Sequence, residues 1–308
     1  MHDAQNPREL ALLVLDEIYE RGAYANLALN KALRGNGLSS LDRKLCTELV
    51  YGTVKTTGTL DWYLCRVINR PFRKMAPRLR TILRMGAYQI LYLERIPDSA
   101  AVNECANLAR YYVNENSVKL VNGVLRQLSR TKDTWQFPQK EEDATLRLAL
   151  SYYHPEWLVR RWKFRFGLPE AEAMCAYDNL VPPLCLRVNT LAISRKTLLE
   201  RLQAAGCEVE PSKWSPDGIV CRHLSSLETL MKEWGRFLYI QDESSMLDAD
   251  VLAPKPGDLV LDFCAAPGGK ATHLAQKMEN KGEIIAMDIH DHRLTLIEEN
   301  ATRLGITN

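Results

Sequence analysis

The first pattern of hydrophobic and polar positions covers residues 8–130, where apolar residues recur every three or four positions, as in Ala11, Val14 and Leu15. This spacing puts the apolar side chains on one face of a helix, which then needs a partner helix to cover it. Breaks such as Pro97 separate successive helical stretches. The pattern predicts six or seven helices in a compact bundle.

After Pro182 and Pro183 short apolar runs alternate with helical stretches. Val, Ile and Leu in short runs bounded by turn residues are typical of strands. The predicted order is strand 184–191, helix 197–205, strands 207–209 and 218–221, helix 227–234 and strand 237–241. The order βαββαβ is that of a small ferredoxin-like module, and such a sheet can serve as a platform for RNA.

Near the C-terminal end two short apolar runs, 259–263 and 284–287, are typical of strands buried on both faces. Gly268 and Gly269 break the first run, and a helical pattern follows. Glycine lets a ligand approach the backbone, and the free N–H groups of a new helix face such a ligand. Asp288, placed twenty residues after Gly268, has the spacing of an acid that accepts hydrogen bonds from ribose hydroxyls.

The turn between these two strands differs from a nicotinamide site. Its residues are Cys264, Ala265, Ala266, Pro267, Gly268, Gly269 and Lys270, in place of G-x-G-x-x-G. Pro267 removes a backbone donor that a pyrophosphate could use, which disfavours a nicotinamide-dependent oxidoreductase. A cofactor with a ribose but no phosphate, such as S-adenosylmethionine, fits better. An ordinary βαβ unit, whose glycines serve only the turn, would show the same spacing.

Charge is distributed unevenly along the chain. The net charge is +2, but residues 1–140 hold 21 Lys and Arg against 13 Asp and Glu. Residues 62–93 contain no acid, and their cations are Arg66, Arg70, Arg73, Lys74, Arg78, Arg80 and Arg84. Residues four apart share a helix face, so these cations could hold RNA phosphates while Trp62 or Phe72 stacks on bases. A solvated rim of the bundle is an equally good interpretation.

A second basic stretch is a predicted helix that opens near Trp157. Its cations are Arg160, Arg161, Lys163 and Arg165. They could contact RNA. They could equally form the wet side of a helix whose inward side chains are Trp157, Leu158, Trp162 and Phe166.

Composition excludes several classes of protein. No apolar run approaches the roughly 18 residues that a membrane-spanning helix needs, and the N-terminus lacks the pattern of a signal peptide. The eight cysteines include no C-x-x-C pair, and no histidine pair lies at a metal spacing backed by other ligands, so we expect no metal site. Cysteines scattered through apolar segments indicate buried thiols in a reducing cytoplasm.

The turn from Cys264 to Lys270 resembles the cofactor loop of RNA 5-methylcytosine methyltransferases, and residues 241–245 and 186–189 resemble other segments of that family. The resemblance runs along nearly the whole chain, to the bacterial 16S rRNA cytosine-5 methyltransferases (the RsmB/Sun/Fmu family). Five strings resemble the NusB-type RNA-binding domain: residues 60–61, 70–71, 86–89, 100–104 and 122–126.

This resemblance implies a multidomain fold. Its expected parts are an all-α NusB-like helical RNA-binding bundle (1–140), a helical linker segment (141–182), a small α+β ferredoxin-like RNA-binding module (183–245), and the start of an α/β Rossmann-like methyltransferase domain (246–308). It implies S-adenosyl-L-methionine as the cofactor, bound by the turn and Asp288, with the seven cations above contacting RNA. The implied partner is 16S rRNA of the small subunit, and neither DNA nor a membrane is expected as a partner. The resemblance also implies a monomeric protein located in the cytoplasm.

In this family a cysteine thiolate attacks carbon 6 of cytosine, which makes carbon 5 able to take a methyl group. That cysteine follows a threonine, and a second cysteine, which follows a proline, assists release. Neither dipeptide occurs in the 308 residues, and Cys264 belongs to the turn. We therefore expect a fragment of the enzyme, inactive by itself, with the nucleophile beyond Asn308. A non-catalytic NusB-like RNA-binding or antitermination module is the alternative.

Overall fold

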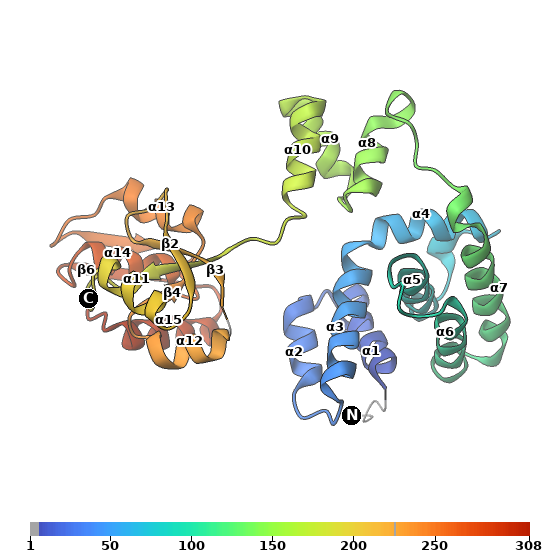
Figure 1. The fold of residues 1–308 in the computed structure, drawn as a ribbon, viewed down its shortest axis with the longest axis horizontal. Helices are drawn as coiled ribbons and strands as arrows, with labels where there is room; N and C mark the ends of the chain where they lie inside the picture. The colour runs from blue at the N-terminus through green and yellow to red at the C-terminus, as the bar shows by residue number, and fades with distance from the viewer. Residues whose placement is uncertain (1–5, 225) are drawn as a thin grey trace. The chain divides into compact units, whose positions relative to one another are not determined.

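The computed structural model describes residues 6–224 and 226–308. Residues 1–5 lie outside the described residues. They are the first residues of the predicted helical domain, and the prediction that the N-terminus is not a signal peptide rests partly on them. The chain divides into two compact units, one ending at Leu180 and one running from Val181 to Asn308. We call them the helical unit and the mixed unit, and each is described by itself (Figure 1).

The helical unit begins with seven α-helices that pack into one bundle, in agreement with the predicted six or seven. Polar caps fix their ends: the Asn6 side chain accepts from the Glu9 N–H at 2.8 Å, and Ser39 caps the third helix. The helices are α1 (Pro7–Arg21), α2 (Ala25–Leu33), α3 (Ser40–Lys55), α4 (Thr57–Val67), α5 (Pro77–Tyr92), α6 (Asp98–Tyr112) and α7 (Glu115–Thr131). A short 3-10 helix, η1 (Phe72–Lys74), lies between α4 and α5.

Three further helices complete the helical unit: α8 (Lys140–Ser151), α9 (Glu156–Phe166) and α10 (Leu168–Tyr177). They follow a second 3-10 helix, η2 (Lys132–Thr134), and have a small core of their own around Leu148 and Val159. One buried hydrogen bond, from the Thr59 hydroxyl to the Leu150 carbonyl at 2.8 Å, ties α8 to α4. The segment is therefore helical and packed against the bundle.

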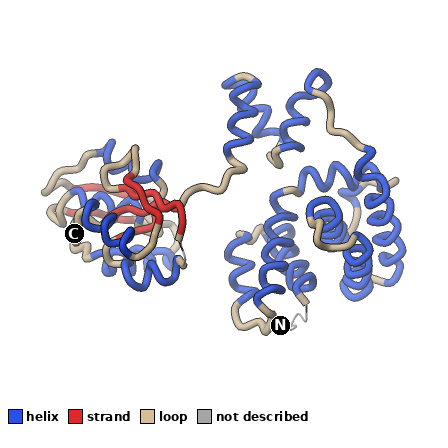
Figure 2. Tube along the Cα trace, viewed as in Figure 1, coloured by secondary structure: helices blue, strands red, loops and turns tan. Residues whose placement is uncertain are grey.

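The mixed unit opens with the predicted βαββαβ module. Its elements are β1 (Leu184–Val188), α11 (Arg195–Ala204), β2 (Glu208–Pro211), β3 (Gly218–His223), α12 (Leu227–Trp234) and β4 (Leu238–Ile240). The sheet order is β2-β3-β1-β4, antiparallel throughout, which confirms the ferredoxin-like expectation. Figure 2 shows the strands of the mixed unit gathered together with helices around them.

The rest of the mixed unit holds the stretch with the seven-residue turn. It consists of α13 (Glu243–Leu252), β5 (Leu259–Asp262), α14 (Gly269–Lys277), β6 (Glu283–Ala286) and α15 (Asp291–Leu304). β5 and β6 pair in parallel, with Leu261 opposite Ile285, and α14 lies between them in the chain and packs on β6. This is the start of a βαβ arrangement, as expected.

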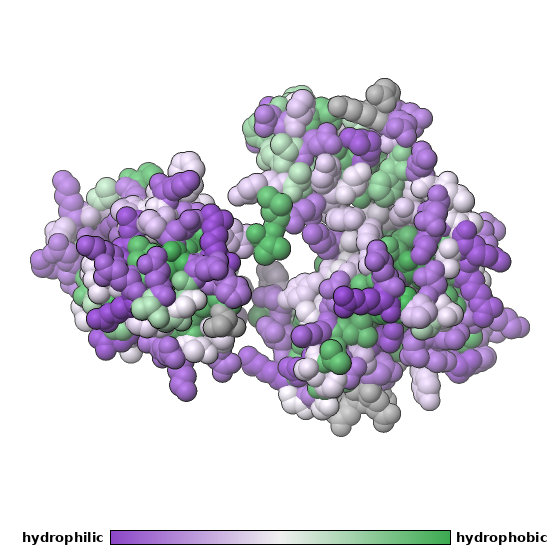
Figure 3. Space-filling model, viewed as in Figure 1, coloured by the Kyte–Doolittle hydropathy of each residue, from purple (hydrophilic) through white to green (hydrophobic). Residues whose placement is uncertain are grey.

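One face of the β5–β6 pair is exposed, contrary to the expectation that these strands are buried on both faces. Alternate residues along the pair point to this face, with exposed fractions of 51% for Leu261, 67% for Phe263 and 46% for Met287. The surfaces of both units are otherwise mostly hydrophilic in the view of Figure 3, with scattered hydrophobic patches. We call the exposed residues Leu259, Leu261, Phe263, Ile285 and Met287 the open sheet face.

Candidate functional site

The predicted cofactor turn leads from β5 into α14, and its two glycines pack against the protein itself. Gly268 caps α14 with φ +97°, a backbone conformation that side chains disfavour. A Cβ on Gly268 would lie 3.2 Å from the Cα of Ile297 in α15, and one on Gly269 would lie 3.2 Å from the Tyr239 ring. A side chain at either position would therefore crowd its neighbour, so both glycines serve packing in addition to any role toward a ligand.

Asp288 lies beside this turn, at the end of β6. The Ala265 N–H donates to the Met287 carbonyl at 2.8 Å, which joins the turn to the residue before Asp288. The Asp288 carboxylate accepts from the His290 N–H at 3.1 Å and lies 3.5 Å from the Arg293 guanidinium. The backbone N–H of His290, more than the charge of Arg293, lowers the pKa of Asp288. The fold thus brings together the turn and the acid that sequence spacing had paired.

Asp262, the last residue of β5, is a site residue that the sequence analysis missed. One of its carboxylate oxygens accepts from the Cys264 N–H at 3.2 Å, while the other is buried without a partner within the described residues. Asp262 and Asp288 close the carboxyl ends of two adjacent parallel strands, where open α/β sheets bind ligands. An acid directly after an apolar run was the signal available in the sequence.

The other turn residues differ in accessibility. Cys264 is exposed, whereas Ala265 is buried. Lys270 is directed to α13, where its amine pairs with Asp248 and its pKa is raised by that hydrogen bond. Because both partners are about half exposed, this pair holds the amine only weakly, and Lys270 stays a predicted cofactor contact.

The seven cations of residues 62–93 fall into two groups, of which the first is paired with acids of other helices in the bundle. Arg84 donates two hydrogen bonds of 2.7 Å to Asp61 in α4, and only 12% of its side chain is exposed. Arg78 pairs with Asp16 in α1 at 2.5 Å, and Arg80 lies 3.8 Å from Glu20 in the same helix. Arg84 is therefore a structural residue, with little of its guanidinium left for RNA.

The second group, Arg66, Arg70, Arg73 and Lys74, is exposed and forms no ion pair within the part of the chain that the structure describes. The Arg66 guanidinium lies over the Trp62 ring, 3.2 Å from its centroid. Phe72 is only 4% exposed, so the expectation that it could stack on bases is wrong. The four cations surround the α4–α5 connection and stay the predicted RNA contacts.

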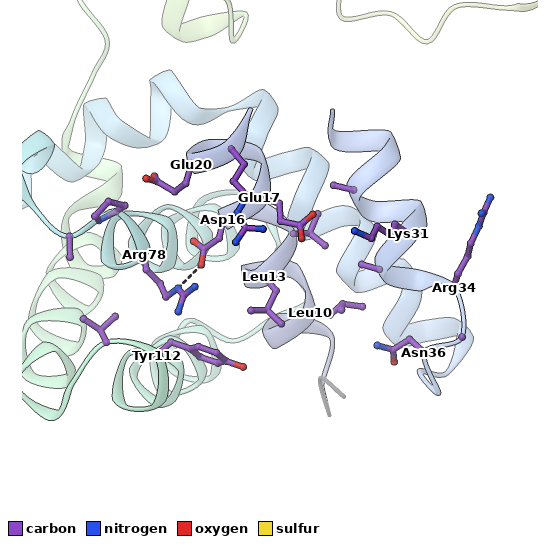
Figure 4. Close-up of a pocket in the computed structure, with 18 residues that line it drawn as sticks. Leu10, Leu13, Asp16, Glu17, Glu20, Lys31, Arg34, Asn36, Arg78 and Tyr112 are labelled. Carbon is purple, nitrogen blue, oxygen red and sulfur yellow. Dashed lines mark hydrogen bonds and ion pairs between the residues drawn. The ribbon is translucent and has the colours of Figure 1, made fainter. Parts of the chain in front are cut away.

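A cavity of about 830 Å³ lies in the bundle, beside α1, α2 and the start of α5. Its lining combines apolar side chains such as Leu10 and Leu13 with both acids and cations, and the Asp16–Arg78 pair lies within it (Figure 4). Burial raises the pKa of Asp16, against the opposing effect of Arg78. The cavity therefore has no dominant charge that would select an anionic or a cationic ligand.

The structure also corrects the orientation expected for α9. Trp157 is 63% exposed and Phe166 is 53% exposed, so neither points inward. Val159, which is fully buried, and Trp162, which packs against the same small core as expected, make the inward contacts. Aromatic and cationic side chains thus share the outer surface of α9.

Three protein families match consecutive parts of the chain. The NusB family matches residues 5–130, the ferredoxin-like domain of RsmF/B-like methyltransferases matches 154–226, and the 16S rRNA methyltransferase RsmB/F family matches 249–308. Their order is that of the helical bundle, the βαββαβ module and the β5–α15 segment. The multidomain fold expected from the sequence is therefore confirmed.

Relatives match almost the whole chain. The probable ribosomal RNA small subunit methyltransferase B of Bacillus subtilis is 40% identical over 302 residues, which are 97% of this chain and 66% of the relative. That of Synechocystis is 36% identical and is matched over 98% of this chain and 67% of its own length. The chain belongs to the ribosomal RNA small subunit methyltransferase B family. It spans about two thirds of the length of these family members.

Solved structures similar to this family member agree with the fold. The crystal structure of PH0851 is 25% identical, with a TM-score of 0.71 over 97% of this chain and 66% of that one. A methyltransferase homologue from Pyrococcus horikoshii is 33% identical, with a TM-score of 0.50 over 54% of this chain and 55% of that one. The first of these matches extends over both the helical and the mixed unit.

Proposed function

We propose that this chain belongs to an enzyme that methylates carbon 5 of a cytosine in 16S rRNA with S-adenosyl-L-methionine. The observation that carries the proposal is the meeting of the Cys264–Lys270 turn with Asp262 and Asp288 at the ends of β5 and β6. Family membership supports the reaction class, because the matched relatives are named as ribosomal RNA methyltransferases.

The residues at the turn fit a donor that carries an amine and a ribose. The buried, unpartnered oxygen of Asp262 is an acceptor suited to an ammonium or a hydroxyl, and Asp288 supplies a second carboxylate close by. A buried polar atom without a partner is costly, so a donor group placed there would be stabilising. When bound, S-adenosyl-L-methionine would supply the electrophilic methyl group, and these carboxylates would orient its ribose and amine ends.

The RNA would be held by the helical unit. Arg66, Arg70, Arg73 and Lys74 give a basic surface around the α4–α5 connection, which attracts the phosphate backbone. We propose 16S rRNA as the partner, and a monomeric cytoplasmic protein. Within residues 6–224 and 226–308, no helix has both the length and the apolar character needed to cross a membrane.

The cysteine nucleophile of the family has no counterpart in these 308 residues, so we propose that it lies outside them. The test compares the 308-residue polypeptide with one extended to the length of its relatives, using labelled methyl donor and undermodified 16S rRNA. We expect label at carbon 5 of cytosine only with the extended protein. Label in RNA incubated with the 308-residue polypeptide, or none with the extended one, would contradict the proposal.

A further inference from the structure

Arg187 in β1 is the most deeply buried charged side chain of the mixed unit, with no exposed surface. Its guanidinium donates to the Gln241 side chain at 2.5 Å, to the Thr272 hydroxyl at 2.8 Å and to the Gly269 carbonyl. A guanidinium with no exposed surface cannot contact RNA, so Arg187 has a structural role. Two of its three acceptors belong to the first turn of α14.

Thr272 extends this contact to the other glycine of the cofactor turn. Its hydroxyl accepts from Arg187 and donates to the Gly268 carbonyl at 2.7 Å. The guanidinium thus holds the carbonyl of Gly269 directly and that of Gly268 through one hydroxyl. Because these two residues begin α14, their position sets where the N-terminal N–H groups of that helix point.

The Tyr239 ring helps to hold Arg187 itself in place. Its guanidinium carbon lies 5.0 Å from the centroid of Tyr239 in β4, and Arg303 of α15 lies 5.6 Å from the same ring. A Cβ on Gly269 would lie 3.2 Å from the Tyr239 ring, so the ring also limits the space beside this glycine. Burial lowers the pKa of Arg187 to about 9, which still leaves the guanidinium charged at neutral pH.

The ferredoxin-like module holds α14 at a second place, one to two turns after Gly269. Asp217, in the loop before β3, lies 3.0 Å from the His273 ring nitrogen and 2.8 Å from the Lys277 amine. Residues 269, 272–273 and 277 recur at helical spacing and so lie on one face of α14. The module therefore contacts α14 along its whole length through polar side chains. Such polar contacts fix the orientation of the helix more strictly than apolar packing does.

We propose that Arg187 is a positioning residue for the methyl-donor site, acting from the ferredoxin-like module through Thr272 and the two glycine carbonyls without touching the donor. This inference rests on the proposed function, since it concerns the same turn. Loss of the Arg187–Thr272 link would let the turn shift, which weakens donor binding and leaves the RNA surface of the helical unit unchanged.

The test uses the full-length protein and two matched threonine substitutions. Thr272→Val keeps the shape of the side chain and removes the hydroxyl link. Thr56→Val is the control, because the buried Thr56 hydroxyl also donates to the carbonyl of a glycine four residues earlier, Gly52, at 2.7 Å, but lies in the helical unit. Thr272→Ser restores the hydroxyl and should restore binding.

Titration calorimetry with S-adenosyl-L-methionine should show about tenfold weaker binding for Thr272→Val and an unchanged affinity for Thr56→Val. In steady-state assays the KM for the donor should rise while the KM for RNA stays unchanged. Donor affinity of Thr272→Val equal to that of the wild type, or no rescue by Thr272→Ser, overturns the inference while the proposed function stands. If the wild-type protein itself binds no donor, the proposed function fails, and this inference fails with it.

Discussion

Replacement of Arg84 by methionine tests whether the cations of residues 62–93 are divided between structure and RNA binding. The change removes two 2.7 Å hydrogen bonds to Asp61 and the contact of the guanidinium with the Tyr19 ring, 4.9 Å away. Breaking a fully buried ion pair costs about 3–5 kcal/mol. Because Asp61 is 32% exposed and water can solvate it afterwards, we expect a loss of about 2 kcal/mol.

Stability is measured by urea unfolding of the protein, monitored by its fluorescence. RNA binding is measured separately, by anisotropy at several salt concentrations. In thermal unfolding, the same loss of about 2 kcal/mol corresponds to a fall in midpoint temperature of roughly 4–8 °C for a unit of this size. Folded Arg84→Met should bind RNA as the wild type does. Unchanged stability of Arg84→Met together with weaker RNA binding would refute the assignment of Arg84 to the structural group of cations.

Arg73→Met is the matched control, since Arg73 is exposed and forms no ion pair within the described residues. Its stability should change by less than about 0.5 kcal/mol. Its RNA affinity should fall, and the slope of log affinity against log salt should decrease by about 1, as expected when one phosphate contact is lost.

Three further predictions concern the mixed unit. Gly268→Ala should destabilise it by about 1–2 kcal/mol or more in urea unfolding, because of the +97° φ and the contact with Ile297; an unaffected midpoint would contradict this. Burial would raise the pKa of Asp217, but bonds from His273 and Lys277 outweigh burial and hold it at about 2, while burial lowers the pKa of His273 from 6.5. Both pKa values are depressed on folding, so the unfolding free energy should fall with acid, first below pH 6.5 and again between about pH 4 and 2. Asp217→Asn should remove about 1–2 kcal/mol of the second fall. A wild-type unfolding free energy that does not change with pH would contradict this prediction. The 308-residue polypeptide should bind a hydrophobic dye and self-associate through its open sheet face, which Leu261→Lys should reduce in light scattering.

Helix ends could be predicted where local capping decides them. The helix 227–234 begins and ends as expected, after the Ser226 cap. The last helix, α15, ends before Gly305, whose left-handed conformation is typical of a residue that ends a helix. The strand expected over 184–191 ends at Val188, because residues 189–192 form a turn closed by the Ala192 N–H and the Asn189 carbonyl. Leu191 and Ala192 continue the apolar pattern through this turn, so periodicity alone could not place the end of the strand.

The candidate site was partly predictable for a similar reason. The turn and Asp288 follow from a local motif and a fixed spacing, whereas Arg84 and Arg78 find their acids in other helices. A run of cations without nearby acids in the sequence says nothing about acids that folding brings in. The unpartnered oxygen of Asp262 is likewise visible only after the strand is placed beside its neighbours.

The contacts of Asn189 have a practical consequence for anyone who wishes to divide or recombine this protein. Its amide donates to the carbonyl of Arg236, before β4, and to that of Leu304, at the end of α15, at 2.9 and 2.8 Å. A cut near residue 245 would remove one of the two acceptors of this amide, and two of the three acceptors of the Arg187 guanidinium. Chimaeras that exchange the ferredoxin-like module between homologues should therefore carry α14 and α15 along with it, because the two halves share one interior.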